Sequence, residues 1–159
     1  MALFVARMAL TAWVGAAVLF VIVGVREVTS PDFSGEVKDR LVALRFPIFY
    51  AAGFVLVGAA WISTALSNVP TQLSRPNQRL VLALVTVVLA GMIADYLWIY
   101  QPLRELVTPP GQPRTQRFVE LHRWSARVNT IQLVLCLIAA TRLNWTARPG
   151  KGAPSESEC

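Results

Sequence analysis

The chain has 159 residues, of which 55% are hydrophobic and only 15% are charged. Soluble domains carry roughly 25% charged residues, so this composition argues against a soluble domain and predicts a membrane protein. The net charge of +6 would suit nucleic acid in a soluble domain. Here the lysines and arginines lie at the ends of apolar runs, as the flanks of membrane spans do. We therefore expect the lipid bilayer as a partner, and no nucleic acid.

The first predicted span covers about residues 4–25, because residues 8–25 contain no charge. This run is long for a signal peptide and no convincing cleavage site follows it, so we expect it to be retained. The connection over residues 26–45 is polar. Its second half, residues 36–45, could form a short amphipathic helix on the membrane surface.

The second and third predicted spans cover residues 46–67 and 80–101. Pro47 lies at the start of the second span, where a proline costs no internal hydrogen bond, and Pro102 ends the third. Small residues recur at every fourth position in both spans and would let helices approach closely in lipid. They are Ala59, Ser63 and Ser67 in the second span, and Thr86, Ala90 and Ala94 in the third.

The fourth predicted span covers residues 117–142. Four apolar runs with short connections predict an all-α integral membrane four-helix bundle, in which sequence neighbours pack antiparallel. This transmembrane domain occupies residues 1–143. The remaining residues, 144–159, form a polar tail that we expect to be disordered.

Two polar stripes run along the fourth span when it is placed on a helix at 100° per residue. One stripe holds uncharged hydrogen-bonding groups and the only histidine of the chain: His122, Ser125, Asn129 and Gln132. The other stripe is charged and holds Glu120, Arg123 and Arg127. We expect the charged stripe to face the lipid headgroups, with Glu120 paired to Arg123 at i,i+3.

Asp95 is the single acidic residue within the first three spans. It lies on the same side of the membrane as His122, and both sit roughly 6–9 Å below the interface at 1.5 Å per residue. A charge in a helix centre costs about 2.5–3.5 kcal/mol, so Asp95 should face the bundle and meet a partner. The candidates are His122, a tyrosine, or Arg45 at the start of the second span. Tyr96, Trp98 and Tyr100, which follow Asp95, indicate an interfacial aromatic belt.

The candidate intramembrane polar site therefore contains Asp95, His122, Ser125, Asn129 and Gln132, with Arg45 as a further partner. Two interpretations stay open. The site is either a structural network that pins helices together, or it binds a proton, a metal or a small substrate.

The sequence contains no recognisable catalytic constellation. A single histidine cannot build a bis-histidine haem, and a zinc site of three or four His or Cys ligands is absent. Cys136 lies within the fourth span and Cys159 is the last residue, so neither has a metal-ligand spacing. No nucleophile elbow, P-loop or dinucleotide-binding glycine pattern occurs. We expect no enzyme, no metal and no cofactor.

The fourth span also follows the pattern F-x-x-L-H-x-x-S-x-x-x-N-x-x-x-L, read here from Phe118, Leu121, His122, Ser125, Asn129 and Leu133. In this it resembles the family known as domain of unknown function 4149, which includes transmembrane protein 205-like proteins. Weaker likenesses over roughly residues 4–142 are Trp13 to Gly15, Phe46-Pro47 with Tyr50, and Tyr100 to Pro102. Arg123 and Trp124 depart from the pattern. The resemblance implies a small four-helix integral membrane protein and supplies no established activity.

Two functional classes follow. The first is a non-catalytic membrane module that packs against partner helices or further copies of itself through the small-residue stripes. The second is a small transporter or ion-binding protein with a polar site between the third and fourth spans. We expect the protein in a bacterial inner membrane. Nine of the 15 lysines and arginines lie on the His122 side, so the positive-inside rule predicts both termini outside.

Overall fold

A computed structural model describes residues 1–67 and 74–145 of the chain. Its elements are α1 (Ala2–Thr29), α2 (Gly35–Ala65), α3 (Arg75–Asp95), the π-helical turn η1 (Tyr96–Tyr100), α4 (Gln101–Leu106) and α5 (Gln116–Asn144). The helix that begins with α3 runs on through η1 and α4, so the described residues form four long helices and no strand. Each of the four is long and apolar enough to span a membrane, which confirms the predicted fold class. Most of the predicted polar tail lies outside the described residues.

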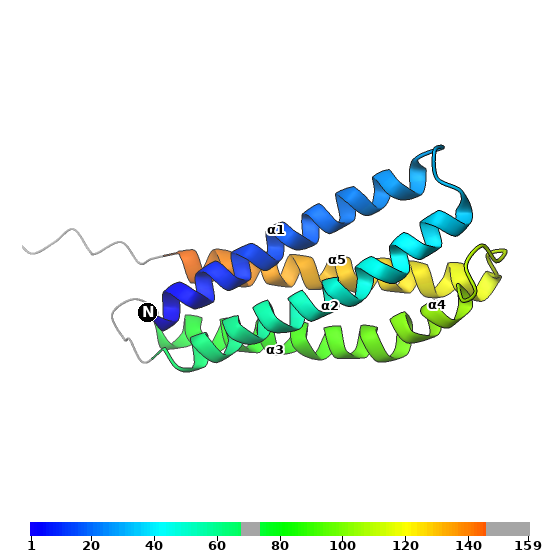
Figure 1. Ribbon diagram of the computed structural model, residues 1–159. Coiled ribbons are helices and arrows are strands. Elements are labelled where there is room, and N and C mark those ends of the chain that lie inside the picture. Colours follow the sequence, from blue (N-terminus) through cyan, green and yellow to red (C-terminus); the bar gives the residue numbers. More distant parts are fainter. Residues whose placement is uncertain (68–73, 146–159) are drawn as a thin grey trace, which may run out of the picture.

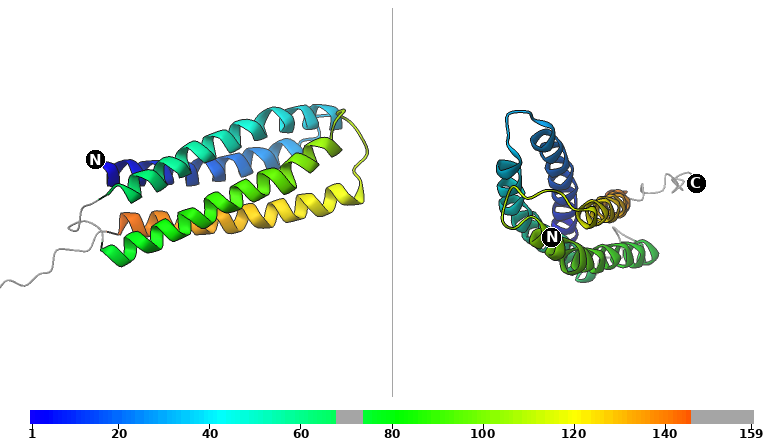
Figure 2. Two further views of the ribbon diagram at one scale, coloured as in Figure 1. Left: turned by 90° about the horizontal axis from the view of Figure 1, so that it is seen from below. Right: turned by 90° about the vertical axis from the view of Figure 1, so that its right-hand side faces the viewer.

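The four helices form a ring of antiparallel neighbours (Figure 1). Helix α1 packs on α2, α2 on α3, α3 on α5, and α5 returns to α1. The N-terminus and the end of α5 lie at one end of the bundle (Figure 2). The opposite end, here called the hairpin end, carries the α1–α2 connection (residues 30–34) and the α4–α5 connection (residues 107–115). Toward the hairpin end, α1 diverges from α5 (Figures 1 and 2).

The core of the bundle is apolar and closely packed near its middle. Val57, Val85 and Cys136 are fully or almost fully buried there. Gly53 of α2 sits where a Cβ atom would lie 2.6 Å from the ring of Trp13 and even closer to Met92. A glycine at this position therefore lets side chains of α1 and α3 meet across α2.

The outer surface is also apolar, unlike that of a soluble protein. Large side chains such as Leu19, Ile48, Val87 and Ile138 are exposed on all four helices. Scattered apolar residues are ordinary on soluble surfaces, but a continuous apolar outer face is expected of helices that contact lipid. The outer surface thus agrees with a membrane location.

Two predicted helix boundaries are wrong. Residues 36–45 do not form a separate surface helix, because α2 begins at Gly35 and runs through Pro47 in its interior. The hydroxyl of Ser34 caps this helix by accepting a hydrogen bond from the Val37 N–H at 3.4 Å. Pro102 does not end the third span, since the helix continues to Leu106. Each proline removes only one backbone donor, and spanning helices tolerate that loss.

Candidate functional site

The carboxylate of Asp95 is the meeting point of three helices. Asp95 is the last residue of α3 and is only 1% exposed. The hydroxyl of Tyr50 on α2 donates to its Oδ2 atom at 2.5 Å, and the side-chain amide of Asn129 on α5 donates to the same oxygen at 3.2 Å. The other carboxylate oxygen, Oδ1, is buried and has no hydrogen-bond partner among the described residues.

Ser125 completes this arrangement from α5. The Asn129 amide also donates to the Ser125 hydroxyl at 3.1 Å and to the Ser125 carbonyl at 2.9 Å. Tyr50, Asp95, Ser125 and Asn129 are called the Asp95 cluster below. Of the partners predicted for Asp95, the tyrosine is therefore the one that the structure provides.

Arg45, proposed above as a partner of Asp95, pairs with Glu27 instead. One guanidinium nitrogen lies 2.6 Å from the Glu27 carboxylate, and the guanidinium carbon lies 4.5 Å from the centre of the Phe20 ring. Helices α1 and α2 form the first hairpin, which brings Glu27 beside Arg45. Gly24 leaves room for this side chain, because a Cβ there would lie 2.9 Å from an Arg45 nitrogen.

His122 does not join the Asp95 cluster. Its side chain is exposed, makes no hydrogen bond to a described residue, and stacks on Phe118 with ring centres 5.9 Å apart. His122 lies seven residues before Asn129, which is about 10 Å along a helix. This distance places the histidine nearer the hairpin end, so His122 does not lie level with Asp95 as predicted.

Gln132 is also separate from the cluster. It is buried where α5 packs on α3, against Gly91, and a Cβ on Gly91 would lie 3.3 Å from the Gln132 amide nitrogen. That nitrogen has no hydrogen-bond partner among the described residues. The predicted five-residue site therefore divides into three members that meet, Asp95, Ser125 and Asn129, and two that do not.

The charged stripe of α5 is exposed over its length. Arg123 and Arg127 face outward, and the Arg127 guanidinium lies 5.3 Å from the centre of the Trp124 ring. The predicted pair of Glu120 with Arg123 is not formed, and Glu120 instead accepts a hydrogen bond from Gln116 at 2.9 Å. Contact of these arginines with headgroups stays a prediction.

Two features were missed by the sequence analysis. The first is Asp39, which is 3% exposed, accepts the Gly111 N–H at 2.9 Å and pairs with Arg114. This carboxylate holds the α4–α5 connection against α2. The sequence did not single out Asp39, because it lies among the acidic and basic residues of the segment 36–45.

The second missed feature is a cluster of tyrosine rings. Tyr100 is buried instead of forming part of an aromatic belt, and its ring centre lies 5.0 Å from Tyr50 and 5.4 Å from Tyr96. The Tyr100 hydroxyl has no hydrogen-bond partner among the described residues. Trp98, in contrast, is exposed as an interfacial residue would be.

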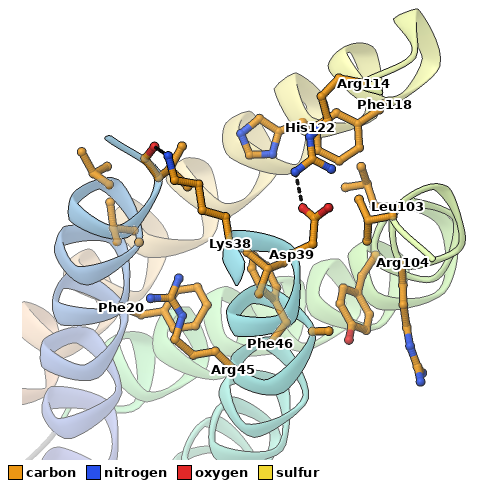
Figure 3. A pocket seen from close by; sticks show the side chains of 18 residues that line it. Phe20, Lys38, Asp39, Arg45, Phe46, Leu103, Arg104, Arg114, Phe118 and His122 are labelled. Carbon is orange, nitrogen blue, oxygen red and sulfur yellow. Dashed lines mark hydrogen bonds and ion pairs between the residues drawn. The ribbon is translucent and has the colours of Figure 1, made fainter. Parts of the chain in front are cut away.

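A cleft of about 380 Å³ opens between α1, α2, α4 and α5 near the hairpin end (Figure 3). Tyr100 and His122 both line it, and the Tyr100 ring packs against Tyr50, so the cleft borders the Asp95 cluster. Within the described residues, no group of three His, Cys, Asp or Glu side chains could hold a metal ion.

No family model, curated protein or solved structure matches this chain. The resemblance seen in the fourth span therefore stays a prediction, and function has to be argued from the geometry alone.

Proposed function

We propose that this chain is a non-catalytic helix-packing module of a bacterial inner membrane. One observation above all supports this: a single buried oxygen of Asp95 accepts hydrogen bonds from two other helices. Inside a bilayer, association between helices has little hydrophobic driving force, and close packing and hydrogen bonds across helices take its place. A polar cluster that joins three spans is suited to that role.

Further hydrogen bonds between helices support the same proposal. The indole N–H of Trp61 on α2 donates to the Thr86 hydroxyl on α3 at 2.9 Å. The guanidinium of Arg7 on α1 donates to the Leu143 carbonyl on α5 at 2.8 Å. Between α1 and α2, Lys38 donates to the Val28 carbonyl and Arg45 pairs with Glu27. Polar contacts therefore occur at all four helix interfaces.

Assembly with other helices would use the small residues of α3. Ala90 is exposed on the outer face of this helix, where a partner helix or a second copy could approach closely. We expect Ala90→Cys to form a disulfide-linked dimer in oxidised native membranes, and Val18→Cys, which is also exposed but lies on α1, to stay monomeric. Equal cross-linking of both variants would indicate random collision and argue against this surface.

The packing role is tested by removing one hydroxyl. Tyr50→Phe should lower the free energy of unfolding in mixed micelles by about 1–2 kcal/mol, because it deletes the bond to Asp95. Tyr96→Phe is the matched control, since Tyr96 belongs to the same ring cluster and makes no hydrogen bond to a described side chain. If both variants lose equal stability, the Asp95 bond has no special role.

A second candidate function is the binding of a small cation by the Asp95 cluster, as part of a small transporter. Asp95 Oδ1 and the Tyr100 hydroxyl are buried without partners among the described residues, and a π-helical turn follows Asp95 directly. Such turns are frequent at functional sites. Cation uptake into proteoliposomes that is lost in Asp95→Asn and kept in Tyr96→Phe would favour this function.

A further inference from the structure

The cleft at the hairpin end combines an apolar wall with a cationic rim, and this pairing goes beyond the packing role. The wall is built from apolar side chains of four elements, among them Val25 of α1, Phe46 of α2, Leu103 of α4 and Phe118 of α5. A volume of about 380 Å³ lies within the range of small-molecule sites. The cleft is therefore large enough for part of an amphiphile.

Two cations of the lining, Lys38 and Arg114, lie at the mouth of the cleft, whereas Arg104 points away from it (Figure 3). Arg45 lies deeper, next to Phe46, and is paired with Glu27. Lys38 lies three residues into α2, near the start of the span, and Phe46 lies eight residues deeper. Eight helical residues cover about 12 Å, so the cleft runs from headgroup level into the hydrocarbon.

The cations keep donors for a ligand, whereas the one carboxylate of the lining has no free oxygen. Asp39 accepts the Gly111 N–H through one oxygen and pairs with Arg114 through the other. Lys38 uses one of its three N–H groups, on the Val28 carbonyl at 2.8 Å. Arg114 uses one end of its guanidinium on Asp39. The mouth therefore favours an acceptor-rich anion over a cation or a zwitterion.

We propose that this cleft binds an anionic phospholipid, with its phosphate at Lys38 and Arg114 and an acyl chain against the apolar wall. Arginine and lysine are the residues that recognise phosphate in proteins, and basic pockets between membrane helices bind acidic lipid headgroups. The occupant is a lipid and not free phosphate, because most of the lining is apolar and lies below the rim.

The test measures lipid bound to the full chain by native mass spectrometry from mixed micelles. Phosphatidylglycerol and phosphatidylcholine with identical acyl chains are offered at equal concentration. We expect phosphatidylglycerol to dominate on the wild type, and Lys38→Gln to lower this preference about fivefold, the effect of one surface cation. Arg40→Gln is the matched control, because Arg40 lies on the same helix, is exposed, and does not line the cleft. It should keep the wild-type preference.

Two further arms locate the site and its ligand. Val25→Trp fills the apolar part of the cleft from an exposed position on α1, and should reduce phosphatidylglycerol binding while thermal unfolding stays as in the wild type. Soluble glycerol phosphate, which has the headgroup and no chain, should not displace the lipid. Equal binding of both lipids, equal losses in Lys38→Gln and Arg40→Gln, unchanged binding in Val25→Trp, or displacement by glycerol phosphate would each overturn the proposal.

Discussion

The hydrogen bond between Tyr50 and Asp95 offers the sharpest prediction, in the form of a double-mutant cycle. The cycle compares the wild type with Tyr50→Phe, Asp95→Leu and the double variant. The two side chains come from different helices and lie 2.5 Å apart at the buried end of α3. Each substitution replaces a polar group by an apolar one of similar size, so the cycle isolates the bond from the surrounding packing.

The expected magnitude follows from what each variant leaves behind. Tyr50→Phe deletes a donor and should cost about 1–2 kcal/mol. Asp95→Leu leaves the Tyr50 hydroxyl buried and unpaired, which costs about 1–3 kcal/mol, although it also removes an acid whose charge is expensive in lipid. Asn129 keeps its two bonds to Ser125 in every variant. In the double variant neither member of the Tyr50–Asp95 pair is left buried without its partner. The double variant should therefore be destabilised by about 1–2 kcal/mol less than the sum of the two single effects.

The assay is the free energy of unfolding of the purified full chain in mixed micelles, measured at one lipid composition for all four proteins. Asp95 is replaced once in the wild-type background and once in the Tyr50→Phe background. The cost of burying the Asp95 charge is common to these two comparisons and therefore cancels in the cycle. If the single effects add to within about 0.5 kcal/mol, the two groups do not interact and the Asp95 cluster is placed wrongly.

Three further predictions rest on other parts of the structure. Gly53→Ala should lower the free energy of unfolding by about 2–4 kcal/mol, because its Cβ would clash with two buried side chains. Gly15→Ala is the control and should cost almost nothing, because no atom lies within 4 Å of a Cβ at that position. Equal effects of the two variants would contradict the packing described. Glu27→Gln should lower the melting temperature by leaving the Arg45 charge half-buried and unpaired, and an unchanged melting temperature would argue against that ion pair. Asp39→Asn should speed amide exchange in residues 107–115 more than elsewhere, and uniform exchange rates would show that this carboxylate does not hold the connection.

The fold was largely predictable, because four long apolar runs allow few alternatives in a bilayer. Helix ends were less predictable. The run over residues 36–45 contains charges that hid its continuity with α2, and the two prolines at 47 and 102 have the pattern of helix boundaries. Both lie inside continuous helices, since the neighbouring backbone bonds suffice to keep each helix intact.

The part of the candidate site that was predictable is the part that depends on helical spacing. Ser125 and Asn129 are four residues apart on α5, so their contact with each other follows from periodicity. The depth estimate placed Asp95 level with His122, whereas its carboxylate meets Asn129, two helical turns further along α5. Tyr50 was hidden among several aromatic residues, and only the packing of α2 on α3 selects it. Arg45 was misassigned because the sequence does not tell which of two nearby carboxylates a cation meets.

The measurement that tests the central claim most directly is thermal unfolding of the wild type and Asp95→Asn across sodium, potassium and lithium chlorides at equal ionic strength. A ligand that binds only the folded state raises its stability in proportion to the logarithm of its concentration. If the Asp95 cluster serves helix packing, the variant should melt below the wild type by the same margin in all three salts. A melting temperature raised by one cation in the wild type and not in Asp95→Asn would contradict the account and make the cluster a cation site.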